Sequence, residues 1–174
     1  LLHRFDEATG VALGEGGAAW RTADGGASWT EVATGTTADL SGQQWLDASR
    51  GFACGTVWET SDDGQGNELQ TAKSAVVLKT SNGGASWSVL SEVTGRVAGP
   101  VFFLPDGQTG WLSTSAWDTT NSRAGPADLR KSTDGGASFV DTGFDPKVGT
   151  VSMGFQMPIN ASYITVMRWD DEAR

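Results

Sequence analysis

The hydrophobic positions of the chain fall in short runs, separated by polar stretches rich in glycine, serine and threonine. Short runs of this kind, with abundant valine and threonine, are typical of β-strands. Glycines and β-branched residues interrupt every window long enough for a stable helix. We therefore expect an all-β chain, with strands at residues 1–5, 10–14, 17–21, 28–32, 44–46, 51–57, 75–79, 87–90, 101–104, 110–115, 129–131 and 139–141. Residues 151–155 and 163–168 predict two more strands.

Three polar stretches separate these runs. Residues 33–42 read as a connection, and residues 59–73 and 118–126 read as long surface loops, because they hold few apolar side chains larger than alanine. Each of the two longer stretches follows the second strand of a group of four. We expect both loops to lie on one side of the molecule.

One octet is written three times, at residues 22–29 (TADGGASW), 80–87 (TSNGGASW) and 132–139 (STDGGASF). An Asp or Asn side chain at a turn entry can accept backbone N–H groups, and glycine takes positive φ without steric cost. The aromatic residue that follows can bury a large surface against whatever covers the sheet. Each octet thus predicts a tight hairpin turn, whose structural residues are Thr22, Asp24, Gly26, Trp29, Thr80, Asn82, Gly84, Trp87, Ser132, Asp134, Gly136 and Phe139.

The octet resembles the Asp-box, or bacterial neuraminidase repeat, and the phrase around it is most similar to the photosystem II stability/assembly factor-like repeats. The resemblance implies that each octet joins the third and fourth strands of a four-stranded β-propeller blade. It implies blades at about 1–33, 43–91 and 100–142, and a half blade at about 150–169. The expected fold is therefore an all-β partial β-propeller of three four-stranded blades plus two strands of a fourth.

A propeller closes on itself, and the smallest usual ring has about four blades. We therefore expect the chain to be part of a longer closed propeller, with the remaining blades supplied by the same longer protein. Closure by a symmetric partner is disfavoured, since two copies would bring two half blades that both lack their third and fourth strands.

Charge narrows the range of partners. The formal net charge is −9 and the pI is near 4.4, which disfavours nucleic acid as a partner. No apolar run is long enough to span a bilayer. The lone Cys54 excludes an intrachain disulfide, and its setting predicts a packing residue. An extracytoplasmic location (secreted, periplasmic or lumenal) is implied by the resemblance alone.

A second sequence pattern also occurs three times. In each case an aromatic residue follows glycine or serine, and a tryptophan stands six residues after that aromatic. Its members are Trp58 after Phe52, Trp117 after Trp111, and Trp169 after Tyr163. Two interpretations stay open: the indoles pack between blades, or they form a binding row on the loop side. In the second case the candidate binding face consists of Trp58, Asp62, Asp63, Glu68, Trp117, Asp118 and Trp169.

Known catalytic sets are largely missing. A sialidase needs an arginine cluster, a tyrosine nucleophile with an adjacent glutamate, and an early Arg-Ile-Pro, whereas this chain has one tyrosine, Tyr163, beside Ile164, and no Arg-Ile-Pro. One His3 and one Cys54 do not make a zinc site or a serine triad. No cofactor is expected, although residues 62–68 faintly resemble a calcium loop without its acid spacing.

Two functions remain after these exclusions. The favoured hypothesis is a non-enzymatic binding or assembly scaffold similar to the photosystem II assembly factor-like proteins, with a protein partner on the loop side. The alternative is a carbohydrate-active propeller, a sialidase-like or other glycoside hydrolase or a lectin, with a glycan on the same side. It would use the indoles together with a pair of carboxylates.

Overall fold

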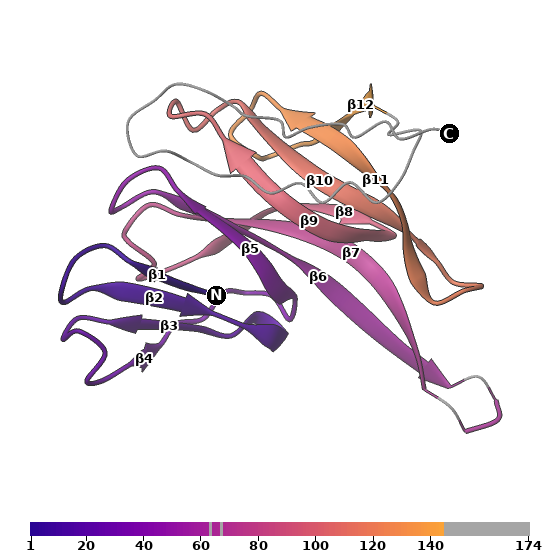
Figure 1. Cartoon of the computed structure of the whole chain (residues 1–174), viewed down its shortest axis with the longest axis horizontal. Helices are drawn as coiled ribbons and strands as arrows, with labels where there is room; N and C mark the ends of the chain where they lie inside the picture. The colour runs from indigo at the N-terminus through magenta and orange to yellow at the C-terminus, as the bar shows by residue number, and fades with distance from the viewer. Residues whose placement is uncertain (63, 67, 145–174) are drawn as a thin grey trace, which may run out of the picture.

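A computed structural model describes residues 1–62, 64–66 and 68–144, which form three four-stranded antiparallel sheets (Figure 1). Blade 1 has the strand order β1-β2-β3-β4, and blade 2 has the order β5-β6-β7-β8. Blade 3 has the order β9-β10-β11-β12. Within these ranges the one helical element is the short 3-10 turn η1 (Glu15–Gly17). The all-β partial propeller predicted from the sequence is confirmed.

The strand bounds follow the expected order, with several strands longer than expected. The twelve strands are β1 Leu2–Arg4, β2 Gly10–Leu13, β3 Ala19–Thr22, β4 Thr30–Glu31, β5 Asp39–Trp45, β6 Gly51–Asp62, β7 Glu68–Thr80, β8 Ser88–Thr94, β9 Arg96–Phe103, β10 Gly110–Asp118, β11 Arg123–Ser132 and β12 Val140–Phe144. No helix in the described ranges is long and apolar enough to cross a membrane. The expected half blade at 150–169 lies outside the described residues.

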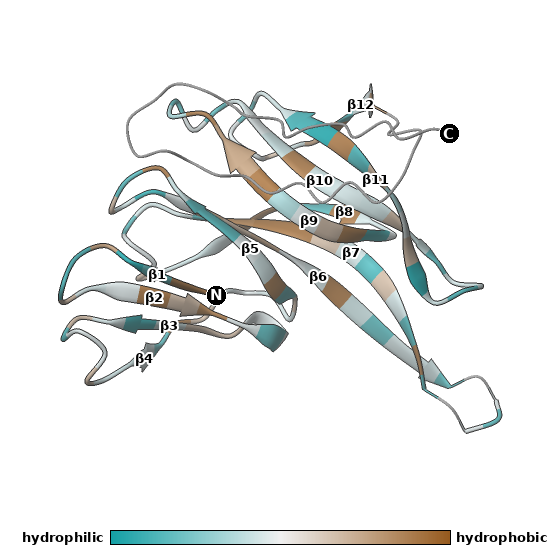
Figure 2. Ribbon diagram, in the orientation of Figure 1, coloured by the Kyte–Doolittle hydropathy of each residue, from teal (hydrophilic) through white to brown (hydrophobic). Residues whose placement is uncertain are grey.

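The two stretches predicted to be loops are instead mostly strand, so that prediction is wrong. β6 and β7 stay paired from Trp58↔Ala72 out to Asp62↔Glu68, and β10 and β11 stay paired out to Asp118↔Arg123. Main-chain pairing does not require apolar side chains, so a polar ribbon can extend once its inner part is fixed. Figure 2 shows hydrophilic colouring dominating the outer end of the β6–β7 hairpin.

The core lies between neighbouring blades rather than within one. Along β6 and β7, successive side chains point to opposite faces of the sheet, so both faces become buried. Ala53 and Leu78 pack toward blade 1, in a cluster with Val11 and Leu13. Residues on the other face of blade 2 pack toward blade 3, in a cluster whose buried members are Phe52, Cys54, Val77, Val101, Phe103 and Leu112.

Ring stacking and hydrogen bonds are among the contacts that tie blade 2 to blade 3. The rings of Phe52 and Phe103 stack at 3.7 Å with an angle of 10° between their planes. The buried Gln44 side chain donates to the Phe103 carbonyl at 3.0 Å and accepts the Phe103 N–H at 2.5 Å. Cys54 is fully buried in this interface, and burial raises the pKa of its thiol to about 12, as suits the predicted packing residue.

Candidate functional site

Each octet forms the same hydrogen-bonded turn. In the first, the Ser28 N–H and hydroxyl donate to the Asp24 carboxylate at 2.9 and 2.6 Å, and the Gly26 N–H donates to the Thr22 hydroxyl at 2.9 Å. The octet at 132–139 repeats these bonds with similar lengths. The octet at 80–87 has an amide in place of the carboxylate, and Asn82 Nδ2 donates to the Ser86 hydroxyl at 2.9 Å.

The carboxylates of these turns are held ionised. The Ser28 hydroxyl and N–H lower the pKa of Asp24 to about 2, and the Ser138 hydroxyl and N–H lower the pKa of Asp134 to about 2. A general acid near neutral pH needs a raised pKa. The arrangement therefore supports a structural turn at each octet, because the lone pairs are occupied by local donors.

The aromatics that end the second and third octets face the preceding blade. Trp87 lies in the cluster between blades 1 and 2, edge-on to Trp45, and Phe139 packs on Phe103 in the cluster between blades 2 and 3. Trp29, the first of the series, is 40% exposed. Leu2 in β1 and Trp20 in β3 are the cross-strand partners of Ala12 in β2, so these three side chains point to the same face of blade 1. Val11 points to the opposite face, toward blade 2.

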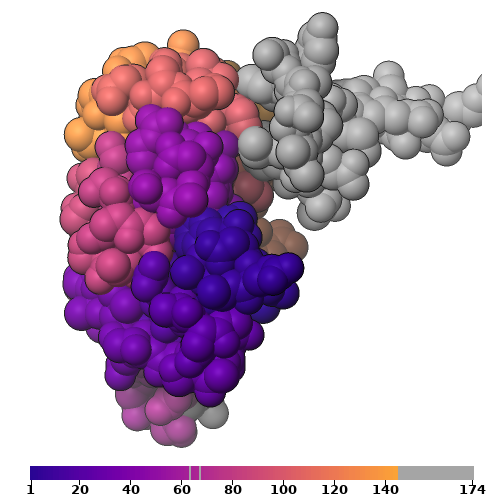
Figure 3. All heavy atoms as spheres, turned by 90° about the vertical axis from the view of Figure 1, so that its left-hand side faces the viewer, coloured from indigo at the N-terminus to yellow at the C-terminus, as the bar shows by residue number. Residues whose placement is uncertain are grey.

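Strand connections alternate between two faces of the molecule. The octet turns lie on one face, which Figure 3 views, with blade 2 separating blade 1 (indigo) from blade 3 (orange). The opposite face carries the β2–β3, β6–β7 and β10–β11 connections and the links between blades. We call it the loop face. The outer part of the β6–β7 hairpin, residues 57–62 and 68–73, projects from it and is called the arm (Figure 1).

Trp58 and Trp117 come together on the loop face, from different blades. Their ring centroids are 5.1 Å apart and their planes make an angle of 78°. Each follows a register shift in its hairpin, between Val57 and Trp58 and between Ser115 and Trp117. Both indoles are half-buried, and the Trp117 N–H is buried with no hydrogen-bond partner among the described residues. The pair therefore combines packing between blades with an accessible aromatic surface. Trp169 lies outside the described residues.

The candidate acids are spread over two hairpins. Asp62 and Glu68 are cross-strand neighbours at the end of the arm, and the Asp62 carboxylate accepts the Gly64 N–H at 2.6 Å. Asp118 ends β10, where the Asn121 amide and N–H and then the Thr120 N–H lower its pKa. Asp63 lies outside the described residues. Asp62 and Asp118 therefore serve first to close hairpin turns.

No three His, Cys, Asp or Glu side chains gather into a metal-binding group within residues 1–62, 64–66 and 68–144. The carboxylates of the arm and of the β10–β11 hairpin come from separate blades. The geometry on the loop face is thus an aromatic pair flanked by single carboxylates, rather than a metal-ligand cluster.

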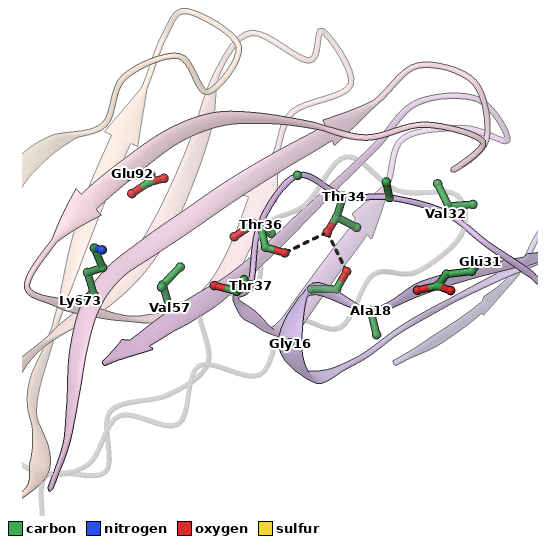
Figure 4. Close-up of a pocket in the computed structure, with 13 residues that line it drawn as sticks. Gly16, Ala18, Glu31, Val32, Thr34, Thr36, Thr37, Val57, Lys73 and Glu92 are labelled. Carbon is green, nitrogen blue, oxygen red and sulfur yellow. Dashed lines mark hydrogen bonds between the residues drawn. The ribbon is translucent and has the colours of Figure 1, made fainter. Parts of the chain in front are cut away.

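Sequence reasoning missed a groove between blades 1 and 2, with a volume of about 630 Å³ (Figure 4). Blade 1 contributes η1 and the link toward β5, and blade 2 contributes three residues from adjacent strands. Its lining includes Gly16, Gly17, Glu31, Thr34, Thr36, Thr37, Val57, Lys73 and Glu92. These residues are far apart in the chain, so the sequence showed that most of them are polar but could not show that they line one groove.

A second missed feature is an ion cluster at the base of the β10–β11 hairpin. Arg96 forms an ion pair with Asp128, whose other oxygen accepts the Thr114 hydroxyl. Arg130 Nε donates to the Thr114 hydroxyl at 3.2 Å and lies 3.6 Å from Asp128 Oδ1. Arg96 and Asp128 are 26% and 17% exposed, so the cluster is largely withdrawn from solvent and links β9, β10 and β11.

Comparisons with known proteins bear on the fold. No protein-family model and no curated protein matches the chain. Among solved structures the chain is similar to one described as YCF48 bound to D1 peptide, with 14% identity and a TM-score of 0.50, covering 81% of this chain and 38% of that one. It is also similar to the GH74 enzyme of Niastella koreensis, with 11% identity and a TM-score of 0.48, covering 79% and 20%.

Both of these structures are β-propellers, and this chain spans less than half of either. At 14% identity, the likeness to the structure described as YCF48 bound to D1 peptide speaks to the fold and not to activity. The three sheets of this chain are the blades of a partial β-propeller.

Proposed function

We propose that the chain belongs to a propeller scaffold that binds a protein segment on its loop face. The observation that carries the proposal is the Trp58–Trp117 pair, half-buried and seated where two blades meet beside a projecting arm. Aromatic side chains at such a seam supply a large contact area at a small cost in side-chain entropy. The similar structure described as YCF48 bound to D1 peptide supports a peptide or protein as the class of partner.

The charge of the chain adds a restriction. Its net charge of −9 opposes docking to an acidic partner surface. At 14% identity the partner of the similar structure does not transfer to this chain by likeness of fold, and we propose only that the partner is a protein segment.

The test is a peptide array probed with the intact chain, followed by the variants Trp58→Ala and Trp117→Ala. We expect loss of binding in both variants, with thermal melts that stay cooperative. Trp29→Ala is the matched control, because it removes an exposed indole that ends the first octet and lies on the free face of blade 1. Equal binding by all three variants would count against the proposal.

A carbohydrate-active propeller is the second candidate, favoured by the same indole pair. An indole can stack on the apolar face of a sugar ring, and Asp118 lies one residue after Trp117. A glycan array and a panel of chromogenic glycosides decide between the two, since binding or cleavage that needs Trp58 and Trp117 would favour this candidate over the scaffold.

We further propose that other blades of the same longer protein cover the free face of blade 1. The support is the exposure of Leu2 at 64%, Trp20 at 38% and Trp29 at 40% on that face. The corresponding apolar residues of blade 2 are buried in the interface with blade 1. The full-length reading frame tests this proposal, because it would show whether further blades are encoded. It also tests the extracytoplasmic location that the family resemblance suggests, since an exported protein would carry a signal peptide.

A further inference from the structure

A second groove lies where the outer part of blade 1 meets the octet of blade 2. Its volume is about 490 Å³, and we call it the octet groove. Alanine and valine side chains supply the apolar part of its lining. The polar part consists of Arg21, Ser28, Thr30, Glu31 and Ser86. The tryptophan pair of the loop face does not line this groove, so the two sites are separate.

Arg21 brings a fixed positive charge to the octet groove. It is the cross-strand partner of Val11 and of Thr30, so all three side chains point toward blade 2. Arg21 Nε donates to the Gly83 carbonyl of blade 2 at 3.1 Å. Among the residues that the structure describes, no acid forms an ion pair with Arg21. The guanidinium is therefore anchored through Nε, and its two terminal Nη groups keep their N–H donors.

The acids nearest to Arg21 in the chain do not neutralise it. Glu31 is the cross-strand partner of Trp20, so its side chain points to the free face of blade 1, away from Arg21. Asp24 does not line the groove, and its carboxylate accepts the Thr22 and Ser28 hydroxyls. The octet groove thus keeps a local positive charge in a chain whose net charge is −9.

The Ser86 hydroxyl differs from its counterparts in the other octets. The Ser28 and Ser138 hydroxyls each donate to an octet carboxylate at 2.6 Å. In the octet of blade 2, Asn82 Oδ1 accepts the Ser86 N–H at 2.9 Å, so Asn82 Nδ2 faces the Ser86 hydroxyl and donates to it at 2.9 Å. An amide nitrogen cannot accept a hydrogen bond, so the Ser86 hydroxyl proton points away from Asn82. Within the described residues this proton has no acceptor.

We propose that the octet groove binds a tetrahedral oxyanion, the phosphate or sulfate group of a small ligand. The Nη groups of Arg21 would take two of its oxygens, and the Thr30 and Ser86 hydroxyls would donate to the others. A carboxylate has two oxygens, which the arginine fork alone can occupy, whereas a tetrahedral anion has further oxygens for the hydroxyls. The net charge of −9 opposes an extended polyanion. This site goes beyond the proposed scaffold function and does not depend on it.

The experiment is an NMR titration of the intact chain with sodium phosphate, sodium sulfate or sodium acetate. Sodium chloride keeps the ionic strength constant, so that general screening does not change during the titration. We expect saturable shifts of the Thr30, Gly83 and Ser86 amides and of Arg21 Nε with phosphate or sulfate. Acetate should bind more weakly than the better of the two. Comparison of phosphate with sulfate identifies the preferred group.

The junction between blades 2 and 3 is an internal control. Lys79 stands directly before its octet, as Arg21 does, but its ammonium lies over the Phe52 ring at 5.6 Å. The Ser138 hydroxyl of the facing octet is already bonded to Asp134. This junction therefore lacks both the free arginine fork and the free hydroxyl, and Lys79 and Ser138 should show no saturable shift.

An exchange of octet residues tests the role of Ser86. Asn82→Asp should fold, because Asp24 and Asp134 form the same turn, but the Ser86 hydroxyl should then donate to the new carboxylate. We expect roughly 10-fold weaker anion binding, from the lost donor and the added negative charge. Asp134→Asn is the matched control, because it makes the reverse exchange in blade 3 and should leave the affinity unchanged.

A second variant tests the cation. Arg21→Gln removes the charge and the terminal Nη donors, and should weaken phosphate or sulfate binding by roughly 10-fold, the effect of one hydrogen bond to a charged group. Thermal melts of all variants check that they remain folded. Because Asn82→Asp keeps the octet turn, its result stays decisive if Arg21→Gln lowers stability.

The outcomes decide the proposal. Shifts that never saturate, or acetate binding as tight as phosphate and sulfate binding, would overturn the oxyanion site. Full binding by Asn82→Asp, or equal losses in Asn82→Asp and Asp134→Asn, would also overturn it. None of these results bears on Trp58 and Trp117, whose role the peptide array tests.

Discussion

Gly17 and Thr36 approach so closely that a Cβ atom on residue 17 would lie 1.9 Å from the Thr36 carbonyl oxygen. Gly17 also has a φ of 78°, a conformation that other residues rarely adopt. The contact joins the β2–β3 connection of blade 1 to the link that leads into blade 2. A single glycine therefore sets one wall of the groove between the blades.

Gly17→Ala should move that wall. Relief of the clash requires the link to shift, which breaks the hydrogen bond from the Thr34 hydroxyl to the Gly17 carbonyl and costs about 2–4 kcal/mol of unfolding free energy. Urea unfolding measures the loss. Gly16→Ala is the matched control, since it shares a positive φ of 64° but has no atom within 4 Å of the added Cβ. A loss no larger for Gly17→Ala than for Gly16→Ala would contradict the close approach.

Acid should weaken the octet turns of blades 1 and 3. The pKa of Asp24 and of Asp134 lies at about 2 in the folded chain, below the ordinary value of 3.8. A lowered folded pKa means that stability is fully present above pH 3.8 and is lost as the pH falls toward 2. The melting temperature should therefore drop between these two values.

The sequence supplies its own control for this titration. Asn82 occupies the corresponding position of blade 2 and makes the same turn without a titrating group. The double variant Asp24→Asn/Asp134→Asn should fold and should lose part of the acid dependence. An unchanged pH profile would show that other carboxylates are responsible.

Phe52→Ala should be among the most damaging single changes. The Phe52 ring is fully buried and stacks on Phe103 across the interface between blades 2 and 3, so truncation leaves a cavity. Loss of a buried phenylalanine typically costs about 3–5 kcal/mol. Val140→Ala, at a side chain that is 69% exposed, should cost less than about 0.5 kcal/mol. Chemical denaturation of both variants measures the two losses of unfolding free energy. A loss for Phe52→Ala no larger than that for Val140→Ala would contradict the prediction.

The free face of blade 1 should make the isolated chain self-associate. Leu2, Trp20 and Trp29 are exposed there, and contiguous apolar surface favours association. Sedimentation velocity should show larger species at high protein concentration, and Trp20→Lys should shift them toward monomer. Leu69→Lys is the control, because Leu69 is 41% exposed but lies on the arm. An identical response of the two variants would argue against a specific role of this face.

Local chemistry accounts for the part of the molecule that could be predicted. The octet residues bond to one another within a few positions, as Thr22, Asp24 and Ser28 do, so no distant neighbour is needed to form the turn. Strand formation likewise depends on nearby residues, which is why the strands and the packing role of Cys54 could be inferred from the sequence, whereas the order of four strands in each blade was implied by the resemblance to the Asp-box repeats. The lengths of β6 and β10 could not, because pairing continues through polar residues once two strands are aligned.

The tertiary structure decided everything that depends on which blade lies next to which. Trp29 and Trp87 end nearly identical octets, yet one is 40% exposed and the other 9%, because the second has a preceding blade to pack against. Trp58 and Trp117 were expected only to occupy equivalent positions, and the register shifts in their hairpins bring the rings into contact. The groove beside β6 exists because blade 1 holds the link before β5. Sequence alone determined the turns and strands, whose bonds are local, while contacts between blades required the assembled sheets.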